Sequence, residues 1–396
     1  MSKTANREPI RRVNLDFAAS TPMRPEAVEA QMAYDRAPFA GANPNSLHTL
    51  GRLAARELEG ARRTVARSMG ARVRSSEVVF TGGGTEANHL ALLGLAEGAR
   101  SRDRSRSRVI VSSIEHDSIL GNLPALKRLG FTIDMLPATP CGRVEPEALA
   151  ALIGDDVALV SVMFANNETG VLQPVAELAQ IAREHGAAMH TDAIQGYLHS
   201  RLDVGELGVD AMSVAAHKVG GPVSLGALYV KGRTPLAPQI LGGGQEAGRR
   251  AGTQDVRSAV AFAAVASGLF ASLDRVEGVV GERADALYRE LLACPSIHAT
   301  MGDPFSVGRL PGIVSVYVDG FESEELILRL DQMGFEVSAG SACSSGSVSA
   351  SHVLTAMGLP GDAAASSLRI SFDDRVDQGD LDRFVDALVS IAQERL

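Results

Sequence analysis

Two reactive side chains stand out because their residue types are scarce in this chain. Only four of the 38 basic residues are lysines, and one of them, Lys218, follows a predicted strand. A lysine amine in a ligand pocket can form a Schiff base, which an arginine cannot do, although a single lysine is more often a solvated surface group. Cys343, one of three cysteines, lies in SAGSACSSGSVS (338–349), whose composition predicts an exposed, mobile loop. Such a thiol is reactive, which favours a chemical use, whereas Cys141 and Cys294 are predicted to be structural.

A glycine-rich turn and an aspartate also fall where predicted strands end. The run TGGGTEAN (81–88) joins a strand to a helix. Its glycines let the backbone approach a ligand, and the free N–H groups at the helix start favour a phosphate; a plain tight turn is the alternative. The run lacks the spacing of the dinucleotide fingerprint and of the P-loop. Asp192, at a strand end in TDAIQ (191–195), either pairs with a protonated heterocycle or caps the next helix.

These features converge on one cofactor, pyridoxal 5′-phosphate. The turn at 81–88 would receive its phosphate, Asp192 would pair with its pyridinium nitrogen, and Lys218 would hold its aldehyde. The thiol of Cys343 completes the reactive set.

The composition narrows the class of protein. Across 396 residues, 38 Lys and Arg face 47 Asp and Glu, and the net charge of −9 argues against direct nucleic-acid binding. Three scattered cysteines cannot build a disulfide framework, which indicates a reducing compartment. The charged N-terminus lacks the apolar core of a signal peptide, and the longest apolar stretch (259–273) is too short to span a bilayer, so we expect a cytoplasmic protein without membrane contact. The charged run RSRDRSRSR (100–108) is interpreted as a solvated loop, and the alternative is a binding surface for an acidic partner or a polynucleotide.

The predicted elements would bring the reactive residues together. Short β-rich runs alternate with helical segments between 77 and 230, which is typical of a mainly parallel α/β sheet. Such sheets bind ligands beyond the carboxyl ends of their strands, where Asp192 and Lys218 fall. Two long helices are expected next, at 256–273 and 278–293.

Two domains are expected, because the pattern changes after the glycine- and arginine-rich stretch at 242–252. The large domain would cover 26–267. A smaller α+β domain would combine 1–25 with 268–396 and carry the cysteine loop at about 338–351.

The chain resembles the class V, fold type I pyridoxal-phosphate enzymes, and within them the cysteine desulfurases of the nitrogen-fixation and iron–sulfur-cluster type. The resemblance runs from about Leu15 to the C-terminus and rests on motifs in a specific order: LDFAASTP, GANPNSLHTLG, FTGGGTEANHLAL, SSIEHDSIL, NNETG, TDAIQ, AHK, GGGQEAGRRAGT, SAGSACSSGS and SSLRIS. It implies an α/β fold with a mainly parallel seven-stranded sheet in the large domain, and a homodimer. It also implies that L-cysteine becomes L-alanine while the sulfur passes, as a persulfide on Cys343, to an acceptor thiol.

The resemblance also implies which residues hold the cofactor: Gly84, Thr85, His116, Asp192, Gln195, His217, Lys218 and Thr253. Gly84, Thr85, His217 and Thr253 would bind the phosphate, with Thr253 reaching it from the other subunit. Gln195 would face the phenolic oxygen of the ring.

Catalysis and substrate binding are implied for further residues. His116 would stack on the ring and transfer a proton, although it is otherwise a surface histidine that caps a turn; Lys218 and Cys343 complete the catalytic set. Asn167 and Arg369 would clamp the substrate carboxylate, for which a guanidinium offers two parallel hydrogen bonds. Asn43 would lie near the substrate.

Two departures from the family pattern bear on function. The usual Ser-x-His-Lys is Ala215-Ala216-His217-Lys218, so a hydroxyl to the phosphate is missing, a bond worth ~1.5–3 kcal/mol or roughly ten- to a hundredfold in affinity. The usual Leu-Glu-Pro-Ser after the cysteine loop is VSAS (348–351), where acceptor proteins would dock. The acceptor stays open between an iron–sulfur scaffold and a thiolation or phosphorothioation protein.

Three functions are compatible with these residues. The first is that of a cysteine desulfurase. The second is that of a related class V enzyme, such as a selenocysteine lyase or an aminotransferase, and the third is that of a non-catalytic relative acting as a binding partner. Cys343 argues against an aminotransferase, which needs no thiol. The joint presence of Lys218, Asp192, His116 and Arg369 argues against an inert relative.

Overall fold

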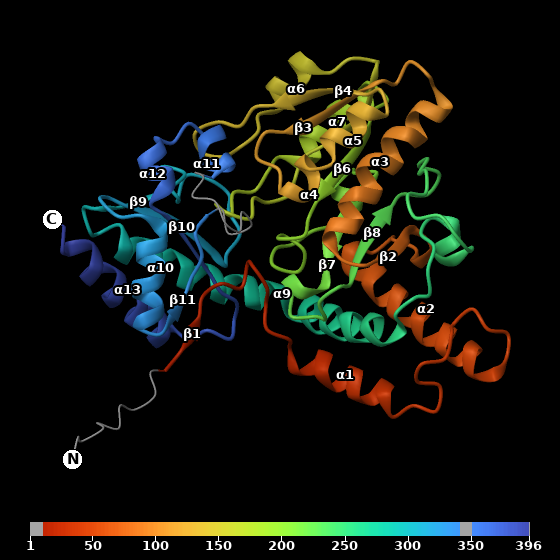
Figure 1. Cartoon of the computed structure of the whole chain (residues 1–396), viewed down its shortest axis with the longest axis horizontal. Coiled ribbons are helices and arrows are strands. Elements are labelled where there is room, and N and C mark those ends of the chain that lie inside the picture. Colours follow the sequence, from red (N-terminus) through yellow and green to blue (C-terminus); the bar gives the residue numbers. More distant parts are fainter. Residues whose placement is uncertain (1–10, 341–350, 396) are drawn as a thin grey trace.

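A mixed sheet of seven strands forms the centre of the larger part of the protein (Figure 1). The structure is a computed structural model in which residues 11–340 and 351–395 are described, so Cys343 and the rest of 341–350 lie outside the described residues. The strands are β2 (Val78–Thr81), β3 (Arg108–Ser112), β4 (Thr132–Leu136), β5 (Val157–Ser161), β6 (Ala188–Asp192), β7 (Ala211–Ala215) and β8 (Gly226–Val230).

The strand order is β2-β8-β7-β6-β5-β3-β4. Four of the six neighbouring pairs are parallel, and β8 is antiparallel to both of its neighbours. The α/β fold with a mainly parallel seven-stranded sheet is therefore confirmed.

Helices cover both faces of this sheet. One face carries α3 (Gly84–Arg102), α4 (Asp117–Leu120) and α5 (Leu123–Arg128). The other carries α2 (Thr49–Met69), α6 (Pro146–Leu152), α7 (Val175–Glu184) and α9 (Val256–Leu291), while α1 (Pro25–Asp35) packs on α9 and α8 (Val204–Leu207) on α7. Successive strand side chains point to opposite faces, so Val79 joins the first core and Phe80 the second.

The two helices expected at 256–273 and 278–293 are a single helix, α9. Gly278 lies inside it, and no atom is within 4 Å of the position that a Cβ would take there. A glycine costs a helix only about 1 kcal/mol, which the burial of α9 on both sides of this point outweighs. Leu269 belongs to the core of the larger part and Val276 to the core of the smaller part. The division into two domains near this point stays a prediction.

The length and composition of α9 alone would allow it to cross a membrane. The expectation that the apolar stretch at 259–273 is too short does not extend to the whole helix, which has 36 residues and an apolar window of mean hydropathy 1.6. Of that window 56% is buried inside the protein, and packing against α1 and α2 accounts for its apolar character. Within 11–340 and 351–395, no other helix passes the same test.

The smaller part is built from both ends of the chain (Figure 1). Its elements are β1 (Val13–Asn14), β9 (Ile297–Ala299), β10 (Ile313–Val318), α10 (Ser323–Gln332), β11 (Phe335–Glu336), α11 (His352–Ala356), α12 (Gly361–Ala365), β12 (Ser367–Ser371) and α13 (Gln378–Gln393). β1 pairs in parallel with β11, and an antiparallel sheet has the order β12-β10-β9. The N-terminal strand therefore lies with the C-terminal elements.

The charged run at 100–108 is partly structural. It joins the end of α3 to the start of β3, as expected of a loop. Arg106, however, donates hydrogen bonds from Nη1 to the carbonyl oxygens of Val157 and His185, at 2.9 and 2.7 Å. This arginine binds the ends of two elements together.

A buried ion pair fixes the glycine- and arginine-rich stretch at 242–252 to the sheet. The Glu246 carboxylate accepts hydrogen bonds from the Arg62 guanidinium at 2.5 and 2.8 Å, and from the backbone N–H of Phe80 at 2.9 Å. Glu246 and Ala247 have φ values of 49° and 56°, in the left-handed region that residues with a Cβ rarely occupy. The ion pair holds this unfavourable backbone in place.

Arg62→Met should therefore destabilise the protein. The Glu246 carboxylate would stay buried without its cation, which costs about 3–5 kcal/mol in the free energy of unfolding. Urea denaturation measures the loss. The matched control is Arg63→Met on the same helix, because the Arg63 side chain is 53% exposed and lies 3.8 Å from Glu59; its effect should stay below about 1 kcal/mol. Equal effects of the two substitutions would contradict the prediction.

Candidate active site

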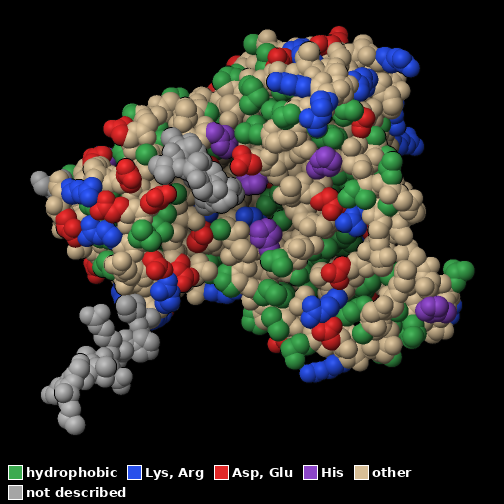
Figure 2. All heavy atoms as spheres, in the orientation of Figure 1, with side chains coloured by type: hydrophobic (Ala, Val, Ile, Leu, Met, Phe, Trp, Pro, Cys, Tyr) green, Lys and Arg blue, Asp and Glu red, His purple; other side chains and the backbone are tan. Residues whose placement is uncertain are grey.

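A cavity of about 270 Å³ lies beyond the carboxyl ends of the central strands. Its lining comprises Ala19, Gly84, Thr85, His116, Ser118, Met163, Ala165, Asn167, Asp192, Ile194, Gln195, Ala215, His217 and Lys218. Eight of the twelve predicted site residues are among them. Figure 2 shows histidine and acidic side chains along the hollow between the two parts of the molecule.

Asp192 ends β6 with its carboxylate buried in the wall of the cavity. Its oxygens accept hydrogen bonds from the Asn88 side-chain amide at 2.6 Å and from the Ile194 backbone N–H at 2.9 Å. Burial raises the pKa of Asp192, and His116 and Lys218 act against this shift. The bond from the Ile194 N–H caps the turn that follows β6, where the sequence suggested a helix cap. This cap leaves Asp192 able to pair with a protonated heterocycle as well, so the two interpretations do not exclude each other.

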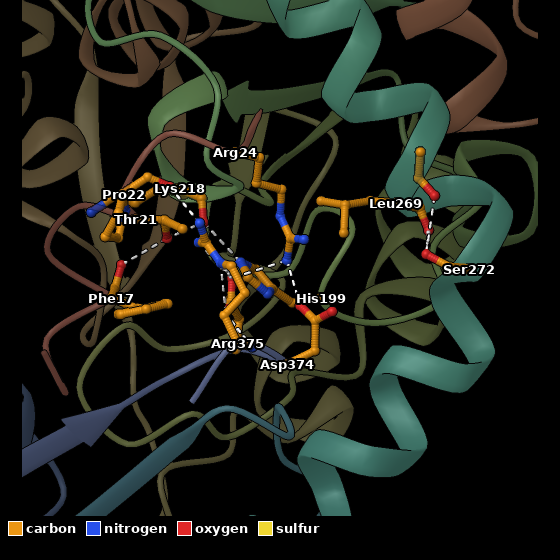
Figure 3. A network of polar contacts seen from close by, with 12 residues as sticks. Phe17, Thr21, Pro22, Arg24, His199, Lys218, Leu269, Ser272, Asp374 and Arg375 are labelled. Carbon is orange, nitrogen blue, oxygen red and sulfur yellow. Dashed lines mark hydrogen bonds and ion pairs between the residues drawn. The ribbon is translucent and has the colours of Figure 1, made fainter. Parts of the chain in front are cut away.

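Lys218 lies just past β7, at the end of a short 3-10 helix (Ala216–Lys218). Its Nζ donates hydrogen bonds to the carbonyl oxygens of Ala18 and Ala19, at 2.6 and 3.0 Å. Its own carbonyl oxygen accepts from the Thr21 hydroxyl at 2.7 Å and lies 2.9 Å from His199 Nε2 (Figure 3). The lysine is thus fixed at both its backbone and its amine.

The segment that contacts Lys218 is itself tied to the smaller part (Figure 3). The Arg24 guanidinium pairs with the carboxylates of Asp373 and Asp374, at 2.9 and 2.6 Å. Arg375 donates to the Pro22 carbonyl oxygen at 3.0 Å. The position of the Lys218 amine therefore depends on both parts of the protein.

The glycine-rich turn after β2 begins α3 at the cavity. Gly83 has φ 135°, and a Cβ on Gly84 would lie only 2.3 Å from Ile194 Cδ1, so a larger residue at Gly84 would require the Ile194 side chain to shift. The turn is fixed from outside, because Glu86 accepts from the Gly82 N–H at 2.8 Å and pairs with Arg250 at 2.6 Å. The free N–H groups at this helix start can receive an anion.

His217 lies on the same cavity without a charge of its own. Burial and, to a lesser extent, the neighbouring Lys218 cation lower its pKa to about 4, so the ring is neutral at pH 7. Its Nδ1 lies 3.3 Å from the Ser20 hydroxyl. A neutral imidazole can still donate one hydrogen bond to a phosphate.

His116 caps a helix start and also lines the cavity. Its Nδ1 accepts the backbone N–H of Ser118 at 3.0 Å and so caps the start of α4. The same residue lines the cavity. With Nδ1 used as an acceptor, the proton of the neutral ring is on Nε2.

The proposed substrate clamp is only partly assembled at the cavity. Asn167 lines it, but Arg369 does not. The buried Arg369 guanidinium donates to the Asn167 carbonyl oxygen at 3.0 Å and pairs with Asp16 at 2.9 Å, and its Nε has no partner among residues 11–340 and 351–395. Gln195 lines the cavity and donates from Nε2 to the Ala18 carbonyl oxygen at 2.9 Å.

Asn43 and Thr253 are exposed, and neither lines the cavity of its own chain. Their loops contact each other, because the side-chain amide of Asn45 donates a hydrogen bond to Gln254 Oε1 at 2.9 Å. Asn45 also donates its backbone N–H to Asn43 Oδ1 at 2.9 Å. The two residues thus share one surface region, and the fourth residue missing from the cavity, Cys343, lies outside the described residues.

Two buried asparagines at the site were not identified from the sequence. Asn88 bridges Asp192 and the Ser118 hydroxyl, at 2.6 and 2.8 Å. Asn166 Oδ1 accepts the backbone N–H groups of Glu168 and Thr169, each at 2.9 Å, and so shapes the turn that presents the next residue to the cavity. Both lie within motifs already quoted, and a polar residue in an otherwise apolar helix or strand end is the signal that could have found them.

This arrangement fits pyridoxal 5′-phosphate. A buried carboxylate with a raised pKa is stabilised by a cationic ring nitrogen. The start of α3 offers N–H groups to a phosphate, and the glycine at that point leaves room that a Cβ would fill. The Lys218 amine on the same cavity can bind an aldehyde.

Comparisons with known proteins agree with this site. The family described as aminotransferase class V matches residues 13–384. Cysteine desulfurase IscS of Dictyoglomus turgidum is 37% identical over 388 residues, which cover 97% of this chain and 95% of the relative. A solved NifS-like protein aligns with a TM-score of 0.87 and 30% identity, over 97% of this chain and all of the other. SspA in complex with cysteine aligns with a TM-score of 0.77 and 30% identity, over 91% and 98% of the two chains.

The matches span nearly the whole chain, and the cavity carries the groups that a pyridoxal-phosphate enzyme requires. The chain belongs to the aminotransferase class V family and, within it, to the pyridoxal 5′-phosphate-dependent cysteine desulfurases.

Proposed function

We propose that the chain converts L-cysteine to L-alanine and acts as a sulfurtransferase, with Cys343 receiving the sulfur as a persulfide. The observation that carries this proposal is the meeting of Lys218, Asp192 and His116 on one cavity, beyond the ends of three different strands. The bound cysteine in the related SspA structure supports the choice of substrate.

The residues of this chain would divide the work of holding the cofactor. Gly84, Thr85 and His217 would donate hydrogen bonds to its phosphate, Asp192 would keep its ring nitrogen protonated, and Gln195 would face its phenolic oxygen. When bound, pyridoxal 5′-phosphate supplies an electron sink for the carbon atom of the substrate that carries the amino group.

Proton and sulfur movements would then fall to three side chains. Lys218, once released from the aldehyde, would take the proton from the substrate Cα, and its fixed backbone keeps the amine at the cavity. The Cys343 thiolate would attack the substrate sulfur, which forms an S–S bond, breaks the C–S bond and leaves the electron pair on carbon. Protonation of that carbon and return of a proton to Cα would complete alanine, and His116 lines the cavity where a proton would have to move.

Substrate binding would use the clamp of Asn167 and Arg369. Among the described residues, the buried Nε of Arg369 has no partner. The guanidinium also pairs with Asp16, so a substrate carboxylate would have to compete with the Asp16 carboxylate for the guanidinium. Asn43 would act nearby, from the surface loop that it shares with Asn45.

The protein would act as a homodimer in the cytoplasm, with Thr253 reaching the phosphate of the partner subunit. The exposure of Thr253, together with large apolar side chains exposed on the same chain, supports such an interface; Leu47 is 89% and Leu241 80% exposed. The final acceptor would be the thiol of an iron–sulfur scaffold or of a thiolation or phosphorothioation protein.

Cys343→Ser and Lys218→Ala should both abolish sulfur transfer, for different reasons. Without its thiol the first variant should still bind the cofactor but release no sulfide with L-cysteine and a reductant. The second should lose covalent cofactor binding and, with its proton acceptor gone, roughly a hundred- to ten-thousandfold in alanine formation. Alanine and sulfide assays with absorbance spectra of the cofactor measure both.

Matched variants control for the loss of any thiol or any amine. Cys141→Ser removes a thiol that contacts Thr139 at 3.1 Å, and Lys231→Ala removes an amine 3.7 Å from Asp210. Both should retain activity. Sulfide release by Cys343→Ser at the wild-type rate would exclude the proposed role of that thiol.

Ala215→Ser should strengthen cofactor binding. Ala215 lines the cavity, and its Cβ lies 3.3 Å from the position of a Cβ on Gly84, beside the expected phosphate position. One added hydrogen bond to a charged phosphate should lower the dissociation constant roughly tenfold or more, as measured by titrating the apoprotein with pyridoxal 5′-phosphate. Ala165→Ser, which adds a hydroxyl elsewhere on the cavity, is the control, and equal effects of both would contradict the prediction.

A further inference from the structure

Glu168 lies where the two flanks of the cysteine-bearing segment meet. Its side chain is buried, with 4% exposed, and its Oε2 accepts a hydrogen bond from the Ser351 hydroxyl at 2.5 Å. At the other flank, a Cβ on Gly340 would lie 2.9 Å from the same oxygen. Gly340 and Ser351 are the described residues on either side of the segment that carries Cys343. One carboxyl oxygen thus binds Ser351 at one flank and faces the position that a side chain at Gly340 would take at the other.

The same carboxyl is joined through the backbone to the proposed substrate clamp. Glu168 directly follows Asn167, whose carbonyl oxygen accepts from the Arg369 guanidinium at 3.0 Å. The backbone of Arg369 in turn pairs with Ser338, two residues before Gly340, through bonds of 2.8 and 3.3 Å. The first flank therefore pairs with β12, the strand that carries the clamp residue Arg369.

Ser351 transmits the contact into α11. Its hydroxyl donates to Glu168 and at the same time accepts the backbone N–H of Leu354 at 3.1 Å, which caps the helix. A hydroxyl has one proton to donate, so the acceptor on Glu168 fixes its orientation. Loss of that acceptor would free the start of α11 and the second flank.

We propose that Glu168 is a positioning residue for sulfur transfer, which holds Gly340 and Ser351, the flanks of the Cys343 segment, against the clamp of Asn167 and Arg369. Glu168 is not among the residues that line the cavity, so it would act through these residues. The proposal rests on Cys343 being the sulfur-accepting thiol.

The contact to Ser351 should depend on pH. The pKa of Glu168 is raised to about 7. Burial is the main cause and outweighs the Ser351 hydrogen bond and the Arg369 charge, which lower the pKa; Asp117 raises it and His116 lowers it by smaller amounts. Above that pH the carboxylate accepts a charge-assisted bond, roughly twice as strong as the neutral bond that remains once the carboxyl is protonated. The positioning effect should therefore be complete above pH 7 and weaken as the pH falls through it.

The first test compares two steps in a single turnover of the holoenzyme with L-cysteine. Glu168→Ala and Ser351→Ala should slow sulfide release roughly ten- to a hundredfold, the value of one charge-assisted hydrogen bond. The first absorbance change of the cofactor, which precedes sulfur transfer, should keep its wild-type rate. Equal slowing of both steps, or no slowing of either, would overturn the proposal.

The second test uses Glu168→Gln, which keeps an acceptor oxygen but cannot ionise. It should restore most of the rate lost in Glu168→Ala. The ratio of the wild-type to the Glu168→Gln rate should stay near one below pH 6 and rise across pH 7, because only the wild-type carboxyl ionises there. The ionisation of Cys343 occurs in both proteins and cancels in this ratio. A ratio independent of pH would overturn the proposed role of the charge.

A third measurement needs no turnover. The rate at which iodoacetamide alkylates Cys343 in the holoenzyme, followed by mass spectrometry, should change in Glu168→Ala and return towards wild type in Glu168→Gln. Glu77→Gln is the matched control, because Glu77 is a buried carboxylate whose partners, Arg74 and Gly232, are not partners of Glu168. An unchanged alkylation rate in Glu168→Ala, or the same change in the control, would contradict the proposal.

Failure of this inference is distinguishable from failure of the proposed function. If Cys343→Ser still releases sulfide, the proposed function itself is wrong. If Cys343→Ser is inactive while Glu168→Ala and Ser351→Ala transfer sulfur at the wild-type rate, only the role of Glu168 is wrong. Should Glu168→Ala fail to fold, Glu168→Gln and Ser351→Ala carry the same tests.

Discussion

A carboxylate buried at the end of β6 has to be compensated, and much of the cavity is arranged around that requirement. Desolvation disfavours the charged form of Asp192, and two hydrogen bonds from the protein offset part of this cost. One of them comes from Asn88, four residues after Gly84 on α3 and hence on the same face of the helix. A single helix therefore positions both the anion-binding turn and the partner of the buried carboxylate. A cationic ligand ring would complete the compensation.

The sheet and the principal site residues could be predicted because local signals determine them. Strand ends in a mainly parallel sheet meet at one edge, so a strand-final Asp192 and a Lys218 just past the next strand had to approach each other. The glycine-rich turn was recognisable because three successive glycines precede a helical segment. The structure gives the steric reason for Gly84, since a Cβ there would lie 2.3 Å from the Ile194 side chain. The single helix α9 was missed because a glycine inside a helix is a weak local signal that burial overrides.

Interactions between distant segments could not be read from the sequence. Nothing in the sequence near Lys218 indicates that the hydroxyl of Thr21, almost two hundred residues earlier, donates a hydrogen bond to its carbonyl oxygen. The ion pair of Arg369 with Asp16 likewise joins opposite ends of the chain. Thr253 lies on the surface of its own chain, so the site role proposed for it would depend on an interface between subunits rather than on local pattern. Such contacts are set by tertiary packing alone.

The unbroken course of α9 also bears on how the two parts can move. At 1.5 Å per residue its 36 residues extend for about 54 Å, and it contributes to one core of the larger part and to the core of the smaller part. Hinge rotation of one part against the other would have to break backbone hydrogen bonds of this helix or detach it from a core. The helix thus acts as a strut that disfavours large domain closure, and access to the cavity has to come from smaller rearrangements of side chains and loops around a fixed frame.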